Sequence, residues 1–255
     1  MTTNQPNGSQ LTERQSVDRM KSSALAHFWV LIPAAGVGSR MAADRPKQYL
    51  ELAGKTILEH SLACFLDHPG LHGMVVSLAL DDPYWPSLAC AQDPRIARAE
   101  GGRERADSVL NGLQRLRELG AQDSDWVLVH DAARPNLARA DLDLLLAQLA
   151  DDPVGGLLAV PVRDTLKRAG SDGRVLQTVD RSPIWQAYTP QMFRLGLLHR
   201  ALAQALAAEV AITDEASAVE WLGQAPRLVE GRADNLKITR PEDLEWLRQR
   251  WAGRS

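Results

Sequence analysis

Residues 28–41 read FWVLIPAAGVGSRM and join an apolar run to a turn made of small residues. The run 28–32 has the length and the side chains of a buried strand. Two glycines directly after a strand let successive backbone N–H groups converge on an anion. Arg40, and Lys47 in the following Pro46-Lys47-Gln48, add positive charge where a polyphosphate would lie. The stretch therefore indicates an α/β sheet with a phosphate-binding loop after its first strand.

This loop matches neither of the two common nucleotide-binding loops. A P-loop ends in Gly-Lys-Ser/Thr, and the dinucleotide fingerprint needs a third glycine where Met41 stands. Taken alone, a G-x-G turn is also what an ordinary strand-to-helix connection requires. The charges of Arg40 and Lys47 close behind it favour a phosphate site over an ordinary turn.

Strand-like runs alternate with helical patterns along the first two thirds of the chain. The expected strands are 28–32, 74–80, 126–129 and 156–160, and the expected helices are 56–66 and 105–119. Thr56 and Glu59 form a capping-box pattern at the start of the first helix. This alternation predicts parallel strands joined by crossover helices, that is, a Rossmann-like α/β fold.

The rhythm breaks after the strand at 156–160. Residues 161–190 contain the turn cluster Gly170-Ser171-Asp172-Gly173 between two β-compatible segments, which predicts an inserted β-arm. Because an isolated two-stranded hairpin is marginal in water, the arm needs a surface to lie against, and a second subunit is one such surface. Helical patterns return at 193–208 and 214–221, followed by a strand around Lys237 and a helix that Pro241 starts.

Composition excludes several classes of function. The 255 residues carry 29 Lys and Arg against 32 Asp and Glu, a net charge of -3, which offers no broad basic surface for nucleic acid. No apolar run approaches the roughly 20 residues that span a bilayer. Cys64 and Cys90 are too few for a disulfide framework, so a reducing, cytoplasmic compartment is expected.

The N-terminus has a layout that resembles a secretion signal, with Arg19 and Lys21 ahead of the apolar run 24–32. That run is short and contains His27, and cleavage after it would destroy the expected phosphate loop. We therefore interpret residues 1–26 as a disordered extension and 27–255 as one domain.

Two further clusters follow expected strands. The first is Gly101-Gly102 with Ser108. Glycines allow close backbone approach to a flat base, and Ser108 can form a hydrogen bond with the edge of that base. A glycine-rich loop followed by a helix cap explains the same residues. Asp131 and Arg134 follow the strand at 126–129, at the edge where open parallel sheets bind ligands. Asp131 can bind a metal or a substrate hydroxyl, and Arg134 can bind a phosphate. An ordinary Asp–Arg pair within a turn would give the same sequence. His130 has no partner at metal or nucleophile spacing and is expected to be structural.

Three later segments add polar side chains, each of which an ordinary solvated turn or helix cap also explains. They are Arg163-Asp164-Thr165 with Val179-Asp180-Arg181 in the arm, 213–217 beginning with Thr213, and 231–237 ending with Lys237. Lys237 alternates with Leu236 and Ile238, as a strand residue should.

As an ordered set, these motifs resemble the 2-C-methyl-D-erythritol 4-phosphate cytidylyltransferase family over about residues 28–247. The set comprises the phosphate loop, Pro46-Lys47-Gln48-Tyr49, 101–108, 129–135, 163–165, Thr189-Pro190-Gln191, 213–217 and 231–241. Arg103 departs from the family pattern, which has an acidic or small residue beside the base. Single motifs are shared with other sugar-nucleotide transferases, so the order of the set carries the resemblance.

The resemblance implies a homodimer with exchanged arms, CTP as donor, a polyol phosphate as acceptor and Mg2+ on the triphosphate, with Asp131 as a candidate ligand. It assigns catalysis to Arg40, Lys47, Arg181 and Lys237, with Arg181 from the neighbouring subunit. The implied substrate contacts are Ala34, Ala35, Gly36, Gly38, Gly102, Ser108, Asp131, Arg134, Thr165 and Thr213.

Rival interpretations remain at this stage. Within the class, the acceptor can be another polyol phosphate such as ribitol 5-phosphate, or the donor another nucleotide. Outside it, a dinucleotide-dependent oxidoreductase lacks its third glycine. A non-catalytic nucleotide-binding regulator would not need all four cations.

Overall fold

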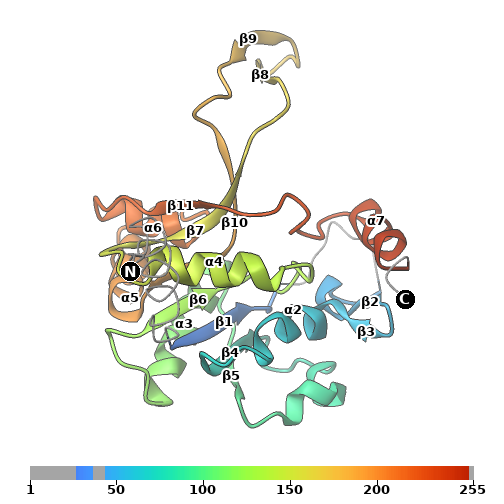
Figure 1. The fold of residues 1–255 in the computed structure, drawn as a ribbon, viewed down its shortest axis with the longest axis vertical. Coiled ribbons are helices and arrows are strands. Elements are labelled where there is room, and N and C mark those ends of the chain that lie inside the picture. The colour runs from blue at the N-terminus through green and yellow to red at the C-terminus, as the bar shows by residue number, and fades with distance from the viewer. Residues whose placement is uncertain (1–26, 37–43, 253–255) are drawn as a thin grey trace, which may run out of the picture.

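The computed structural model describes residues 27–36 and 44–252 and shows a sheet between two layers of helices (Figure 1). The seven-stranded sheet has the order β11-β7-β10-β6-β1-β4-β5. All neighbouring strands pair in parallel except β10, which is antiparallel to both β6 and β7. The expected Rossmann-like α/β fold is confirmed. The expected N-terminal extension, and the loop residues Gly38 and Arg40, lie outside the described residues.

Strand β1 (Phe28–Pro33) lies inside the sheet, between β6 and β4, and separates its two apolar cores. Phe28, Val30 and Ile32 face one side, where they pack in a core with α2 and α4. Trp29 and Leu31 face the other side, in a core with α3, α5 and α6. Successive side chains of a strand point to opposite faces, so an uninterrupted apolar run requires helices on both.

Helices α2 (Ile57–Leu66) and α3 (Arg105–Glu118) lie where the apolar periodicity places them. Thr56 caps α2, and Glu59 completes the capping box. Strands β4 (Leu71–Leu78) and β6 (Trp126–Val129) flank β1, and β7 is Gly155–Pro161. Leu80, expected at the end of a strand, lies beyond β4 and is largely exposed.

Several elements were not expected from the sequence, among them β5 (Ile96–Glu100), α4 (Arg139–Leu149) and β11 (Arg227–Glu230). β5 and β11 are the two edge strands. Each is short and has a single buried side chain, so neither forms an apolar run that predicts a strand. The expectation of a helix from residue 193 was wrong by two residues. Phe193 still belongs to β10 (Trp185–Arg194), and α5 is Leu195–Ala207.

The inserted arm is confirmed as a hairpin of β8 (Leu166–Ala169) and β9 (Val175–Val179) that projects far from the sheet (Figure 1). The segment rejoins the sheet earlier than expected, because Trp185 of β10 pairs with Pro161 of β7. Two arm side chains, Val175 and Leu176, are apolar and 62% and 66% exposed.

A small third cluster closes the C-terminal end of the molecule. It joins the hairpin β2 (Glu51–Leu52) and β3 (Lys55–Thr56) to α7 (Pro241–Ala252), which lie together in Figure 1. Ile238 is fully buried in this cluster. The strand expected around Lys237 is absent from the described ladders; this segment instead bonds through Ile238 N to Ala133 O (2.8 Å).

Gly156 permits the close pairing of β7 with β11. A Cβ atom at Gly156 would lie 2.0 Å from the carbonyl oxygen of Arg227, which is backbone and cannot rotate away. We expect Gly156→Ala to lower the free energy of unfolding by about 1 to 3 kcal/mol, because overpacking forces the strands apart. Gly36→Ala, where no atom of the described residues lies within 4 Å of the added Cβ, is the control for stability. Equal urea midpoints for the two variants would contradict this account.

Candidate active site

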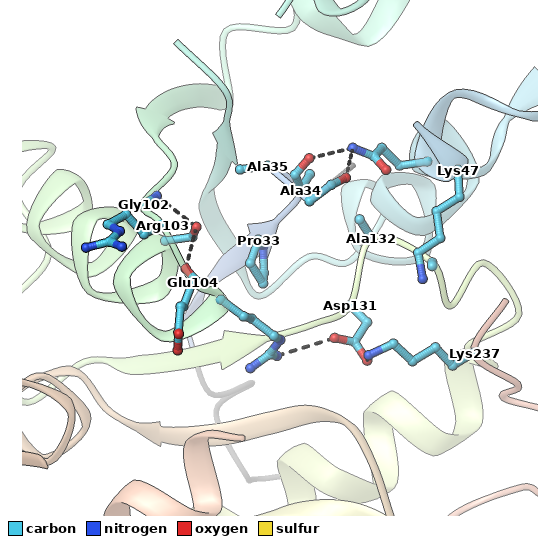
Figure 2. Close-up of a pocket in the computed structure, with 15 residues that line it drawn as sticks. Pro33, Ala34, Ala35, Lys47, Gly102, Arg103, Glu104, Asp131, Ala132 and Lys237 are labelled. Atoms are coloured by element: carbon cyan, nitrogen blue, oxygen red, sulfur yellow. Dashed lines mark hydrogen bonds and ion pairs between the residues drawn. The ribbon is translucent and has the colours of Figure 1, made fainter. Parts of the chain in front are cut away.

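A pocket lies at the carboxyl ends of β1, β5 and β6 (Figure 2). Its lining includes Pro33 to Gly36 after β1, Gly102 to Arg105 after β5, and Asp131 to Ala133 after β6. The chain runs from β1 outward to β4 and β5 and then returns to β6 on the other side of β1. Open α/β sheets bind ligands at such a reversal of strand order. The topology therefore places the pocket where a ligand site is expected.

Gln48 holds the loop that follows β1. Its side chain is 3% exposed, and Nε2 donates to the carbonyl oxygens of Ala34 (2.6 Å) and Gly36 (3.1 Å). In a trans peptide unit the N–H points opposite to the C=O. Turning the Ala34 carbonyl toward Gln48 therefore directs the N–H of Ala35 the other way. Gln48 lies in the motif Pro46-Lys47-Gln48, but nothing in the sequence beside it indicates this role.

Lys47 and Lys237 enter the pocket from segments far apart in sequence. Lys47 begins the short 3-10 helix η2 (Lys47–Tyr49), and its Nζ donates to the Ile238 carbonyl at 3.0 Å. Lys237 directly precedes Ile238 in the chain. Both lysines line the pocket (Figure 2). The expected juxtaposition of these two cations is therefore present.

Gly101 and Gly102 lie against the loop after β1. A Cβ atom at Gly101 would lie 2.2 Å from the Cβ of Ala35, so glycine lets the two loops meet. The hydroxyl of Ser108 accepts from Gly102 N (2.9 Å) and donates to Glu104 O (3.1 Å). Helix capping falls to Glu104, in a capping box with Asp107, and not to Ser108. Ser108 lines the pocket and fixes Gly102 within it.

Arg103 also lines the pocket, at the place where the family pattern differs. Its side chain is exposed, and in Figure 2 it extends away from Lys47 and Asp131. Its charge is therefore directed to solvent and not toward the two lysines.

Asp131 is the electrostatic centre of the site. It is 7% exposed and meets Lys237 Nζ at 3.0 Å, Arg134 Nε at 3.2 Å and Arg105 Nη2 at 3.3 Å. Burial alone would raise the pKa of Asp131, but the three cations outweigh it and hold that pKa well below its ordinary value. Asp131 is therefore a carboxylate that stays ionised.

His130 next to it is structural, as expected. It is fully buried, and its ring nitrogens bond to Arg134 O (3.0 Å) and Thr189 Oγ1 (3.0 Å). Burial lowers the pKa of His130 to about 4, so the ring is neutral near pH 7.

Four expected site residues lie outside the described pocket lining, namely Thr165, Arg181, Thr213 and Arg134. Thr165 and Arg181 are exposed in the arm, where Arg181 donates to the Arg163 carbonyl. Thr213 is exposed just before α6 (Glu215–Trp221) and does not cap that helix, since the cap is Asp214. Arg134 pairs with Asp131 Oδ2 through Nε and donates from Nη1 to Asn235 O at 2.7 Å.

Two charged residues of this site were not assigned from the sequence. Arg105 lines the pocket and pairs with Glu215, which is 1% exposed. Arg105 lies in the motif 101–108 and Glu215 in 213–217, but a pair separated by 110 positions leaves no signal in local spacing.

The donor atoms of the described residues form no self-contained metal site, because no group of three His, Cys, Asp or Glu side chains converges there. Asp131 and Glu104 are the carboxylates of the described pocket lining. One carboxylate beside a cationic phosphate site suits Mg2+, which usually binds through one or two carboxylates and substrate phosphates.

Comparison with known proteins agrees with this geometry. A family model described as 2-C-methyl-D-erythritol 4-phosphate cytidylyltransferase matches residues 28–248. This chain belongs to that family. A cytidylyltransferase of this name from Pseudomonas fluorescens is 77% identical over 233 residues, which cover 91% of this chain and 99% of that protein. One from Pseudomonas putida is 78% identical over 230 residues, covering 90% and 98%.

Solved structures of the family share the fold. A 4-diphosphocytidyl-2C-methyl-D-erythritol synthase is 45% identical with a TM-score of 0.76, covering 88% of this chain and 98% of that one. The cytidylyltransferase from Francisella tularensis is 37% identical with a TM-score of 0.75, covering 89% and 99%. This member of the family is thus an enzyme, a nucleotidyltransferase.

Gln48 provides a direct test of the loop geometry. In Gln48→Glu, a carboxylate of the same shape would face two carbonyl oxygens that now accept from the amide. We expect a loss of about 1 to 3 kcal/mol in the free energy of unfolding, because both acceptors lose their donor. Amide exchange of Ala35 should accelerate. Gln122→Glu is the matched control, since the exposed Gln122 amide makes one such bond, to Gly120 O. Unchanged exchange at Ala35 would refute the role of Gln48.

Proposed function

We propose that this enzyme transfers CMP from CTP to 2-C-methyl-D-erythritol 4-phosphate, giving 4-diphosphocytidyl-2-C-methyl-D-erythritol and pyrophosphate. Membership of the family supports this reaction, and the observation that carries it is a pocket at the strand reversal with Lys47 and Lys237 on one side. A nucleotidyl transfer brings two anions together, so it needs cations at this place.

The reaction requires no general base. The nucleophile is an oxygen of the acceptor phosphate, and a phosphomonoester with a second pKa of about 6 is mostly ionised at neutral pH. That oxygen attacks the α-phosphorus of CTP, a new P–O bond forms, and the bond to the β-phosphate oxygen breaks to release pyrophosphate. The protein contributes position and neutralising charge, which act most strongly on the transition state.

In this mechanism Lys47 and Arg40 stabilise the charge that develops on the α-phosphate. The loop residues Ala34, Ala35, Gly36 and Gly38, with Gly102 and Ser108, bind the nucleotide. Small side chains suit this role because a flat base needs close backbone approach.

Lys237 and Arg181 hold the acceptor phosphate, while Asp131, Arg134, Thr165 and Thr213 contact the acceptor. Lys237 lies 3.0 Å from Asp131 Oδ2 before substrate arrives. When the acceptor binds, the Lys237 ammonium group therefore changes its partner from the Asp131 carboxylate to the acceptor phosphate.

A magnesium ion belongs to this proposal, carried mainly by the CTP phosphates with Asp131 as the protein ligand. When bound, it neutralises phosphate charge. The low pKa of Asp131 supports this assignment, since only an ionised carboxylate competes for a hard cation.

A homodimer with exchanged arms completes the site. The arm projects from its own chain in Figure 1 and exposes Val175 and Leu176, which an isolated hairpin cannot bury. Arg181 lies in this arm, outside the pocket of its own chain. We therefore propose that each pocket receives Arg181 and Thr165 from the neighbouring subunit.

We place the enzyme in the cytoplasm. Cys64 and Cys90 are both free, and burial raises their pKa values to about 12 and about 11, so neither thiol is reactive. Separately, no described helix has the length and apolar character to cross a membrane.

The function is tested by pyrophosphate release with a panel of nucleotides crossed against a panel of polyol phosphates. We expect CTP with 2-C-methyl-D-erythritol 4-phosphate to give the highest kcat/KM. A higher value with ribitol 5-phosphate, or with another nucleotide, would replace the proposed substrate pair.

The shared site is tested by mixing two inactive enzymes. Lys47→Ala and Arg181→Ala homodimers should each lose activity, the first through turnover and the second through acceptor binding. After subunit exchange, one pocket of each heterodimer joins an intact Lys47 to an intact Arg181 from the other chain. Activity should return toward half of the wild-type value. Exchange confirmed by mass without recovered activity would show that Arg181 acts within its own chain.

A further inference from the structure

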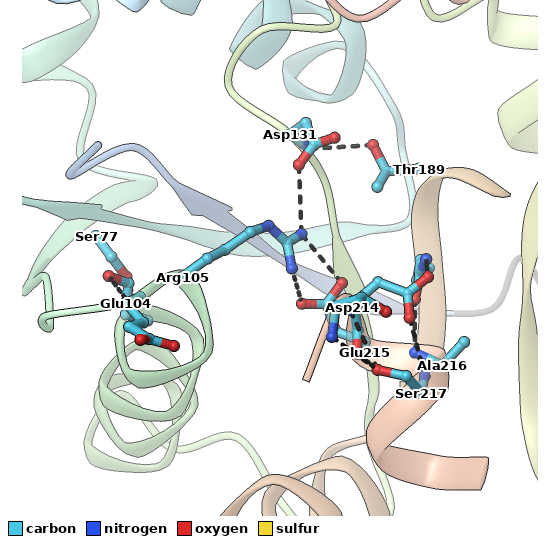
Figure 3. A network of polar contacts seen from close by, with 12 residues as sticks. Ser77, Glu104, Arg105, Asp131, Thr189, Asp214, Glu215, Ala216 and Ser217 are labelled. Atoms are coloured by element: carbon cyan, nitrogen blue, oxygen red, sulfur yellow. Dashed lines mark hydrogen bonds and ion pairs between the residues drawn. The ribbon is translucent and has the colours of Figure 1, made fainter. Parts of the chain in front are cut away.

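The guanidinium of Arg105 bridges two buried carboxylates (Figure 3). Its Nη1 and Nη2 meet Glu215 Oε1 and Oε2 at 2.6 and 3.1 Å, and Nη2 also meets Asp131 Oδ1 at 3.3 Å. The bridge joins the first residue of α3, the first residue of α6 and the segment after β6. It thus connects the nucleotide side of the pocket to the segment that carries Thr213.

Glu215 is fixed at its own end. Gln191 of β10 donates to Asp214 Oδ2 (2.9 Å) and accepts from Ala216 N (2.8 Å), so the start of α6 is tied to the sheet on both sides of Glu215. Asp214 also caps α6 through Ser217 N at 2.9 Å. Arg105 therefore pairs with a carboxylate whose two neighbouring residues are hydrogen-bonded to the sheet.

Stability alone gives little reason for this bridge. Burying charged groups carries a desolvation cost, and replacing a buried ion pair with packed apolar side chains is often neutral or stabilising. A bidentate guanidinium–carboxylate pair instead supplies a defined geometry. This points to a role in holding Asp131.

The two oxygens of Asp131 are divided between different partners. Oδ1 meets Arg105, while Oδ2 meets Lys237 at 3.0 Å and Arg134 at 3.2 Å. If Lys237 turns to the acceptor phosphate, the Oδ2 side loses one of its partners. The clamp on Oδ1 keeps its geometry because Glu215 holds Arg105.

We propose that Arg105, clamped by Glu215, is a positioning residue that fixes Asp131 while Lys237 moves to the acceptor phosphate. The proposal rests on the function proposed above. Glu215 and Asp131 take three of the five N–H groups of Arg105, and Glu215→Gln separates this role through Asp131 from direct contact with the substrate.

Three enzymes test the clamp. Arg105→Lys keeps the charge but loses the fork, Glu215→Gln keeps the shape but loses the charge, and Arg105→Met with Glu215→Met replaces the pair by apolar side chains that can pack. Arg117→Lys is the control, because Arg117 lies on the same helix and pairs with Asp123 at 2.7 Å, with comparable exposure of its side chain (28% against 32%).

We expect each clamp variant to lower kcat by about 10- to 100-fold, since small misplacements of a site cost this much. The Kd for CTP, measured by calorimetry, should stay within about threefold of wild type, because the bridge does not form the nucleotide loop. The KM for the acceptor should rise. Arg117→Lys should match wild type. All assays run below the melting temperature of every variant, with the folded fraction measured by circular dichroism.

Two results would overturn the proposal. Wild-type kcat in folded Glu215→Gln, with loss only in Arg105→Lys, would make Arg105 a direct substrate ligand. Wild-type kcat in the double Met variant would make the bridge merely structural, and this variant decides the question if Glu215→Gln does not fold. If the wild-type enzyme is inactive with CTP and 2-C-methyl-D-erythritol 4-phosphate, the proposed function is refuted instead. The kcat of the clamp variants is then measured with the substrates that the wild-type enzyme does turn over.

Discussion

A carboxylate almost shut off from water needs cations around it, and this need organises the catalytic end of the protein. Asp131 lies 7% exposed at the end of β6, where no bulk solvent offsets its charge. Arg134 of the same segment, and Arg105 and Lys237 from two other segments, converge on it. Breaking such a set leaves a buried charge uncompensated, so each partner constrains the others. The segments that carry substrate contacts are thereby registered against one another.

Local patterns predicted those parts of the structure that local physics decides. The capping box of Thr56 and Glu59, the helix from Arg105 and the buried strand at 126–129 all follow from side chains within one or two turns. β5 and β11 at the sheet edges were missed because half of their side chains face solvent. Lys237 was expected on a strand, but its segment has no neighbouring strand to pair with in the described part of the chain, and alternation alone does not make a ladder.

The site itself was predictable only as far as motifs carry chemistry. Lys47, Gly102, Ser108, Asp131 and Lys237 line one pocket, as the ordered set of motifs implied. Gln48 and Glu215 act by holding other groups, and nothing in the residues beside them reveals partners 14 and 110 positions away. Such supporting side chains are specified by topology, which places distant segments together.

The dependence of the pocket on the C-terminal segment has a consequence for synthesis on the ribosome. Proteins emerge from the N-terminus and fold as they emerge. Strands β1, β4, β5 and β6 can assemble early, yet the Ile238 carbonyl that receives Lys47 is made 191 residues after Lys47 itself, directly after Lys237. Helix α7, which packs with Ile238 in the third cluster, comes later still. A nascent chain that has not yet reached Lys237 and Ile238 is therefore without a finished catalytic pocket.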